Sequence, residues 1–289
     1  MRWRQGRRSR NVEDRRGMGA GRRVPRRGGL KLGGGAGIIV LLIGMFLGVD
    51  ISGLMGTSGS GGLNSPQLSP GTSQSRTSDE STAFVEVMLG YNEDVWTKLF
   101  ASANQQYRPS KLVIFDGGVQ SACGYTSSAA GPFYCPGDYQ VYIDLEFFRE
   151  FEKMGAGGDF AQAYVLAHEV GHHVQNLLGV SMAVQRRQRS VSKIEANRLS
   201  VLTELQADCY AGVWAHHAHK DNQLLEPGDL EEGMNAAATI GDDAMMGRAG
   251  ARIRPESFTH GTSAQRQQWL YKGLESGDPQ QCNTFAGVL

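Results

Sequence analysis

The feature of this sequence that most constrains its fold is a pair of histidines four residues apart, in the HEVGH run at residues 168–172. Residues four apart in an α-helix lie on one face about a turn apart. The sequence predicts such a helix from Phe160 to about Leu178, because the glycine-rich residues 155–158 would end any earlier helix. Asp159 and Gln162 form a capping-box pattern at its start.

On this helix, His168 and His172 can bind one metal ion together. Glu169 lies roughly 100° around the helix from His168, close enough to reach a water molecule on that metal without being a ligand. Zinc lowers the pKa of bound water toward about 7 and polarises a carbonyl group. We therefore expect a zinc site in which Glu169 is the general base.

A catalytic zinc needs a third protein ligand and an open fourth position. A second long helix is expected at residues 193–218, where Glu204 and Asp208 lie one turn apart. We expect Glu204 to bind the metal and Asp208 to accept the free ring N–H of a metal-binding histidine. The alternative is an ordinary solvated acidic pair, but Leu205 and Cys209 indicate that much of this helix is packed.

The remaining histidines are weaker candidates. His173 points away from the predicted metal and is expected to be a surface imidazole or a support for the site. His260 could donate a hydrogen bond to the oxyanion of a tetrahedral intermediate, or could be structural, and Arg266 is a weaker candidate for the same task. A further cluster is expected to decorate a helix end, where cations suit the helix dipole: His216, His217 and His219.

Charge is distributed unevenly along the chain. Residues 1–31 hold eleven Arg and one Lys against Glu13 and Asp14, which leaves 17 basic and 27 acidic residues beyond position 31. Clustered cations alone would suit nucleic acid, but the apolar run that follows them makes nucleic acid an unlikely partner. We expect four regions: a basic cytoplasmic arm (1–35), a transmembrane anchor (36–55), a flexible Gly/Ser linker (56–80) and a folded metal-binding domain (81–289).

The anchor prediction rests on 14 residues, 36–49, that contain no charge or strongly polar group. An Arg excess before such a run keeps the N-terminus in the cytoplasm and sends the following chain across the membrane. We therefore expect a single-pass protein of the cytoplasmic membrane with its folded domain periplasmic or extracellular. A cleaved signal peptide is the competing reading, and a buried core helix fits less well because linker follows it.

Four cysteines form an even set in a chain expected to be exported. Cys123 and Cys135 bracket a Gly- and Ser-rich loop that a disulfide would close, and Cys209 with Cys282 would tie the C-terminal tail to a helix. Three connectivities are possible, and free buried thiols are the alternative. At least one disulfide is expected.

The rest of the domain reads as α+β. A helix is expected at residues 83–100, with Ser78 or Ser81 as its cap, and strands at Lys111–Phe115 and Tyr139–Asp144. Further helices should follow Asp229, with Glu232 as its capping residue, and Thr262, with Gln265. The second strand could present an edge to which an extended peptide adds as another strand.

Several strings resemble a known bacterial family, the putative neutral zinc metallopeptidases, membrane-tethered proteins of the zincin group. They are GPFYCP (131–136), VYID (141–144), GDFA (158–161), HEVGHHVQ (168–175), ELQADC (204–209), FTHG (258–261) and Cys282. The resemblance covers residues 81–289. It implies a zincin with two His ligands, one Glu ligand and a Glu base.

Together these observations predict a zincin-like α+β domain behind one N-terminal transmembrane helix. The expected activity is hydrolysis of peptide bonds in a peptide or protein substrate by zinc-activated water, with Glu169 as the base. The alternative is a non-catalytic, zinc-stabilised envelope scaffold that binds partners. A structural zinc usually has four closed protein ligands and does not need a base, so Glu169 argues against the scaffold.

Overall fold

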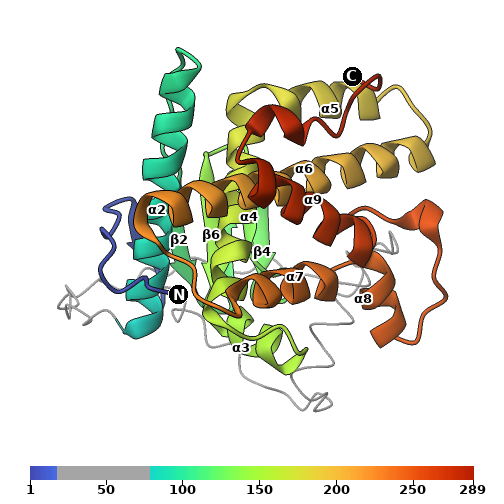
Figure 1. The fold of residues 1–289 in the computed structure, drawn as a ribbon. Helices are drawn as coiled ribbons and strands as arrows, with labels where there is room; N and C mark the ends of the chain where they lie inside the picture. Colours follow the sequence, from blue (N-terminus) through green and yellow to red (C-terminus); the bar gives the residue numbers. More distant parts are fainter. Residues whose placement is uncertain (18–78) are drawn as a thin grey trace, which may run out of the picture.

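The computed structural model describes residues 1–17 and 79–289. These residues form a mixed α+β fold with eight α-helices and two small sheets, which confirms the predicted class (Figure 1). The helices are α2 (Glu80–Ser102), α3 (Glu146–Lys153), α4 (Asp159–Leu177), α5 (Val180–Gln188), α6 (Lys193–Asn222), α7 (Asp229–Thr239), α8 (Asp242–Arg248) and α9 (Ser263–Ser276). The strands are β1 (Val12–Asp14), β2 (Lys111–Phe115), β3 (Gly118–Ser121), β4 (Gly124–Ser127), β5 (Phe133–Cys135) and β6 (Gln140–Asp144).

The main sheet has the strand order β1-β2-β6-β5, in which the first three strands are parallel and β5 is antiparallel to β6. Both predicted strands are present as β2 and β6, and all but the first residue of each is buried. The strand predicted to be an edge is therefore internal. The edge on that side is β5, because β6 pairs with β2 on one side and with β5 on the other.

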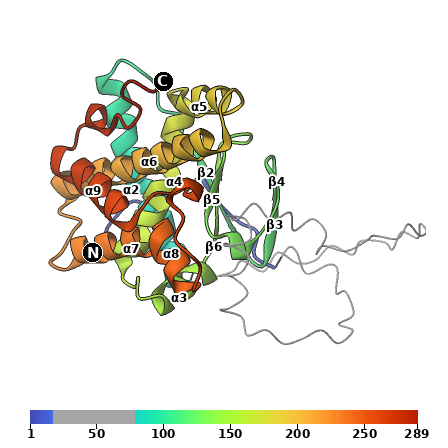
Figure 2. The ribbon, with the colours of Figure 1, turned by 90° about the vertical axis from the view of Figure 1, so that its right-hand side faces the viewer.

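Helix α4 packs between the sheet and the other helices, against α6, α7 and α2 (Figures 1 and 2). The β3–β4 hairpin lies beyond the sheet, away from the helices (Figure 2). Helices α6 and α9 approach closely at two glycines. A Cβ at Gly212 would meet the Leu270 carbonyl oxygen at 2.1 Å, and one at Gly273 would meet that of Cys209 at 1.9 Å. This contact fixes α9 relative to the helix that carries Glu204.

The helices begin close to the predicted positions, but the residues that cap them are not always the predicted ones. Helix α9 has the predicted capping box of Thr262 and Gln265. The capping box predicted for α4 is wrong: its N-cap is Gly158, without a side-chain bond. The N–H of Phe160 instead donates to the Glu232 carboxylate at 3.1 Å. Glu232, which we expected to cap its own helix α7, therefore caps a neighbour, an arrangement that local sequence does not reveal.

The start of α2 also differs from the prediction. Its N-cap is Asp79, whose carboxylate accepts the Thr82 N–H at 2.8 Å, rather than Ser78 or Ser81. The last two residues of the predicted linker, Asp79 and Glu80, thus belong to the folded unit.

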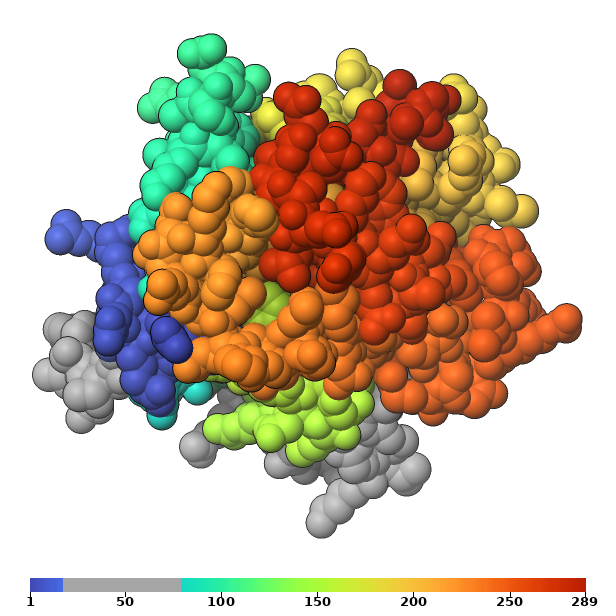
Figure 3. Space-filling model, viewed as in Figure 1, coloured from blue at the N-terminus to red at the C-terminus, as the bar shows by residue number. Residues whose placement is uncertain are grey.

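Residues 1–17, which we call the N-terminal segment, are part of the same folded unit. Strand β1 pairs with β2, with Val12 opposite Leu112. Trp3 is only 8% exposed and packs edge-on against Phe84 of α2, with ring centroids 5.2 Å apart. Figure 3 shows the segment in blue beside α2. The expectation that the folded domain begins near Ser81 is therefore corrected. Strand β1 and the core residue Trp3 lie within the arginine-rich stretch, whose charge does not indicate that it is folded.

The basic side chains of the N-terminal segment meet acidic side chains of α2. Glu93 is buried, and its carboxylate accepts hydrogen bonds from Arg7, Ser9 and Asn11 at 2.8, 2.6 and 2.7 Å. A buried carboxylate needs such partners to offset its desolvation. Since all three come from the segment, α2 in its present form depends on the segment being docked.

Both cysteine pairs suggested by the sequence are disulfides. Cys123 is bonded to Cys135, and Cys209 is bonded to Cys282, 73 positions along the chain. The first joins the turn between β3 and β4 to β5, and the second ties the C-terminal tail to α6. The prediction of at least one disulfide is confirmed.

The predicted anchor (36–55) and nearly all of the predicted linker lie outside the described residues, as does the second half of the predicted arm. Over residues 1–17 and 79–289, none of the helices combines the length and apolar character needed to cross a bilayer.

Candidate metal centre and active site

Helix α4 places the two histidines of the HEVGH run on one face, with ring centroids 4.7 Å apart. Gly171 lies between them, where α4 crosses α6. A Cβ at this position would meet the Ala207 carbonyl oxygen at 2.9 Å. The glycine thus lets the two helices approach closely enough for side chains of α6 to reach His168 and His172.

Glu204 of α6 faces both imidazoles. Its carboxylate oxygens lie 3.1 Å from Nε2 of His168 and 3.4 Å from Nε2 of His172. One ligand atom from each of the three residues lies within 4.8 Å of the others. The structure therefore brings together the three residues predicted to bind the metal, and they could hold a metal ion.

Hydrogen bonds fix the orientation of both imidazoles. The Nδ1–H of His168 donates to Asp208 at 2.8 Å, and that of His172 donates to Gln175 at 2.9 Å. Each Nε2 faces Glu204, so that once it has given up its proton its lone pair would be directed at a zinc ion bound there. The donor set fits zinc on this ground. Asp208 occupies its predicted place, but the sequence analysis missed Gln175, three residues after His172 on the same helix face.

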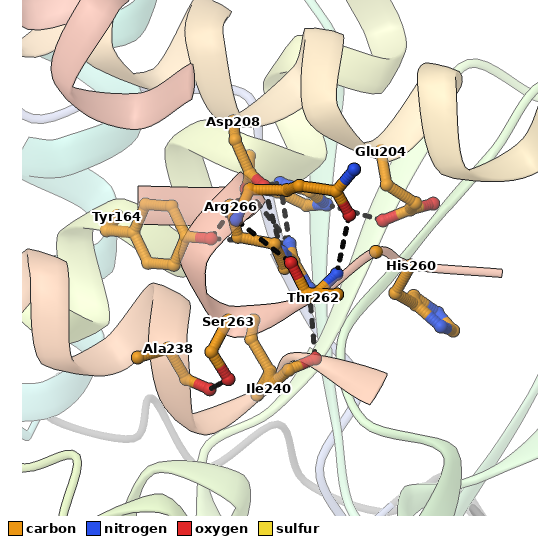
Figure 4. Close-up of polar contacts among 12 residues, drawn as sticks. Tyr164, Glu204, Asp208, Ala238, Ile240, His260, Thr262, Ser263 and Arg266 are labelled. Carbon is orange, nitrogen blue, oxygen red and sulfur yellow. Dashed lines mark hydrogen bonds and ion pairs between the residues drawn. The ribbon is translucent and has the colours of Figure 1, made fainter. Parts of the chain in front are cut away.

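A buried polar cluster holds Asp208. Arg266 of α9 donates to both Asp208 carboxylate oxygens, at 2.8 and 2.9 Å, and the Tyr164 hydroxyl donates to one of them at 2.6 Å (Figure 4). Arg266 is 2% exposed and also donates to the Ile240 carbonyl oxygen. The suggestion that Arg266 stabilises an oxyanion is not supported, because its guanidinium is engaged in positioning the carboxylate behind His168.

The charges of this centre are strongly coupled. Burial lowers the pKa of His168, but Asp208 and Glu204 outweigh it and raise the pKa to about 10 in the metal-free protein. Burial raises the pKa of Glu204, but the two histidines outweigh it and hold the pKa well below its usual range. Burial also raises the pKa of Glu169, and there it prevails over the histidines. The His168 imidazole and the Glu169 carboxylate thus bind a proton more tightly than usual, whereas the Glu204 carboxylate stays ionised.

His260 lies at the opposite wall of the site from α4 and is backed by a buried carboxylate. Asp242, fully buried, accepts the backbone N–H groups of residues 259–261 at 2.8 to 3.0 Å. Its second oxygen lies 3.3 Å from Nδ1 of His260. Asp242 therefore orients the loop, while the Thr259 hydroxyl lies within hydrogen-bond distance of the ring, 3.1 Å from Nδ1 of His260. The sequence analysis missed Asp242, since 18 residues separate it from the histidine and no local pattern links them.

The remaining histidines are structural. His173 is fully buried rather than at the surface; its Nε2–H donates to the Arg108 carbonyl and Nδ1 accepts from the Tyr134 hydroxyl. Burial lowers its pKa to about 4. His216 and His217 bond to carbonyl oxygens at the end of α9, at Leu274 and Gly277.

Two cavities meet at the metal group, where Tyr134, His172 and Glu204 line both. The apolar cavity, of about 400 Å³, also contains Glu169 and His260 and is lined by Pro132, Phe133, Phe147, Val165, Ile240 and Met245. The polar cavity, of about 300 Å³, is lined by Ser181, Gln185, Gln188, Ser200 and Thr203. Strand β5 borders the metal group, so an extended peptide would add at β5 and not at the predicted strand 139–144.

The sequence of the chain matches a protein-family model and the sequences of several bacterial proteins. The family model described as "Putative neutral zinc metallopeptidase" matches residues 1–285, which includes the N-terminal segment that the sequence resemblance did not cover. The uncharacterized protein YpfJ of Escherichia coli K12 is 47% identical over 295 residues, covering 99% of each chain. The uncharacterized protein Rv2575 of Mycobacterium tuberculosis H37Rv is 40% identical over 261 residues, covering 84% of this chain and 85% of the relative. No solved structure matches the chain.

Proposed function

Because the chain belongs to the family of putative neutral zinc metallopeptidases, we propose that it is a zinc-dependent peptidase acting at the group of His168, His172 and Glu204. The observation that carries the proposal is Glu169. Its side chain is almost fully buried, lines the apolar cavity beside the metal group, and accepts no hydrogen bond from the described residues. A carboxylate desolvated in this way costs stability, a cost that functional sites accept, and a scaffold zinc would not require it.

The residues divide the chemistry between them. Zinc, when bound, makes water a better nucleophile and polarises the carbonyl group of the substrate. Glu169 is placed to accept the proton of the attacking water and to return it to the departing amine, a task favoured by its raised pKa. Asp208 and Gln175 hold the imidazoles in the tautomer that faces the metal.

We further propose that His260 donates a hydrogen bond from Nε2 to the carbonyl oxygen of the substrate as negative charge develops on it. Asp242 is the positioning residue of the loop, and the Thr259 hydroxyl holds Nδ1 of the ring. A hydrogen-bond donor that is held in place before the reaction stabilises the developing charge without a cost for moving into position.

The experiment that tests the proposed activity uses the full-length chain and its Glu169→Gln variant. We expect the natural chain to bind one zinc and to hydrolyse peptides until a chelator is added. The variant should keep its zinc and lose about 10²- to 10⁴-fold in kcat, because the amide cannot accept a proton. Zinc content by mass spectrometry and peptide turnover measure the two effects. Equal turnover by both proteins would exclude Glu169 as the base, and no turnover by either would favour the scaffold.

Location is a separate proposal. The two disulfides suit an oxidising compartment, so we propose that residues 79–289 lie outside the cytoplasm, attached to the membrane through residues 36–55. The N-terminal segment adds a condition. A single crossing between the segment and the domain would put them on opposite sides of the membrane, and β1 could not then pair with β2. The expected topology, with the N-terminus inside, conflicts with this packing.

A further inference from the structure

The cavities beside the metal group differ in chemistry, and the difference bears on which peptides the site takes. The apolar cavity is lined by aromatic and aliphatic side chains, whereas the polar cavity is lined mainly by neutral hydrogen-bonding groups. They share Tyr134, His172 and Glu204, so a chain laid across the metal group would enter both. Each cavity is large enough for one or two side chains.

The charged carboxylate and guanidinium groups that line the two cavities already have partners or roles at the metal centre. Among the described residues that line them, the carboxylates are Glu169 and Glu204, which belong to the metal centre. The only Lys or Arg among the same lining residues is Arg266, which both oxygens of Asp208 hold. Peptidases that remove terminal residues need a charged group to bind a free α-amine or α-carboxylate, since a buried, unpaired charge is costly. This lining offers none.

The position of Glu169 gives the cleft a direction. It lines the apolar cavity and not the polar one. The group that returns the proton must reach the nitrogen of the departing amine. The residue that carries this nitrogen therefore lies on the apolar side, and the residue that carries the carbonyl lies toward the polar cavity.

We propose that the two cavities form one cleft that binds an internal segment of an extended chain and cuts it before a large apolar residue. The inference rests on the proposed peptidase function and makes it more specific: the site is an endopeptidase site. Apolar burial supplies affinity on one side, and uncharged hydrogen bonds orient the chain on the other. Strand β5, which borders the metal group, offers an edge for the backbone between them.

Peptides with free and with blocked termini test this directly. The zinc-loaded full-length protein is incubated with a mixed-sequence library in both forms, and mass spectrometry maps the cuts. We expect kcat/KM to differ less than about threefold between forms, with Leu, Phe or Met after the cut. Removal of single terminal residues from free peptides alone would overturn the inference while leaving the peptidase function intact. Absence of any hydrolysis would overturn both.

Binding gives a second readout that does not require turnover. Fluorescence anisotropy with the zinc-loaded Glu169→Gln variant should give equal affinity for blocked and free forms of one labelled peptide. Strong preference for a free terminus would contradict the proposal even if no peptide is cut.

Two variants probe the cavities separately. Ser181→Trp should obstruct the polar cavity and lower kcat/KM at least tenfold, whereas Met182→Trp, next to it but 61% exposed and outside the lining, should not. Met245→Lys should reduce cleavage before Leu by about tenfold and favour acidic residues there. An unchanged kcat/KM in Ser181→Trp together with unchanged cut sites in Met245→Lys would overturn the assignment of the cavities.

Discussion

The metal centre and the N-terminal segment bury polar groups in opposite ways. At the centre, Glu169 is buried without a hydrogen-bond partner among the described residues, and the imidazoles of α4 face a carboxylate of α6. In the N-terminal segment, the buried Glu93 is satisfied by three donors, and Trp3 fills space in the core. The first arrangement leaves one buried carboxylate, that of Glu169, without a hydrogen-bond partner among the described residues, whereas the second satisfies its buried carboxylate.

This difference teaches which region contributes stability and which contributes chemistry. Unpaired buried carboxylates cost free energy of folding, and functional sites accept that cost. Apolar burial and strand pairing in other regions of the protein offset it. Changes at the metal centre should therefore alter zinc binding and turnover with little loss of stability, and changes in the N-terminal segment should do the reverse.

The largest expected effect is on zinc binding. Glu204→Ala removes one of the three proposed protein ligands and should abolish stoichiometric zinc binding at neutral pH. The metal-free variant should unfold slightly below the midpoint of the metal-free natural chain at neutral pH, because the ion pairs of Glu204 with His168 and His172 are lost. Metal analysis after dialysis and thermal unfolding measure the two quantities.

Asp208→Asn is the comparison variant for this test. It keeps a side chain of the same shape beside Arg266 and should weaken zinc affinity only about 10- to 100-fold. If Asp208→Asn loses more zinc than Glu204→Ala, the roles of the two acidic residues are reversed.

Reporter fusions at the two ends of the chain test whether the N-terminal segment docks in the cell. A reporter active only outside the cytoplasm should give the same result before Met1 and after Leu289, because β1 and β2 pair within one chain. We expect activity at both ends. Activity at the C-terminal end alone would restore the single-crossing topology and would mean that the docked segment does not form in the membrane-bound protein.

Much of the metal centre could be predicted because its information is local. The spacing of His168 and His172, and of Glu204 and Asp208, is meaningful within single helices. Gln175 follows the same rule, since it lies three residues after His172, and could have been predicted. Asp242 could not be predicted, because its contact with His260 depends on how α8 meets the loop before α9.

The fold was predictable to the same extent. Long helices and buried strands carry strong periodicity, and α4, α6, β2 and β6 were found close to their true limits. Strands β1 and β5 have three residues each, too few to show a period. The charge asymmetry between the arm and the domain was itself a signal of docking, since opposite charges attract, but it also fits a membrane topology.

A smaller effect is expected from Trp3→Ala. Replacing a core tryptophan costs about 3–5 kcal/mol of unfolding free energy. Trp3 is 8% exposed, so we expect a loss in this range, with zinc still bound stoichiometrically below the transition. Denaturant unfolding measures the loss, and Arg10→Ala, an exposed site in the same segment, should stay within about 0.5 kcal/mol of the natural chain. A loss below about 1 kcal/mol for Trp3→Ala would show that the segment is not docked in solution.

The smallest expected effect distinguishes two arginines of the N-terminal segment. Arg7 reaches the buried Glu93 and the exposed Asp94, both at 2.8 Å. Arg4 pairs with Glu80, both partners being about 70% exposed, and its guanidinium lies 5.0 Å from the centroid of the Trp3 ring. Fully exposed ion pairs contribute about 0–1 kcal/mol and are screened by salt.

Methionine keeps the apolar stem of either arginine and removes its charge. Arg7→Met should therefore cost about 1 kcal/mol, because Glu93 keeps Ser9 and Asn11 as partners, and Arg4→Met should cost less, about 0.5 kcal/mol, from its contact with Trp3. Unfolding at low and at high salt separates the two, since the loss at Arg7 should persist where Glu93 is shielded from solvent. Equal losses that vanish together in salt would mean that the segment is held by general charge attraction rather than by the buried contact at Glu93.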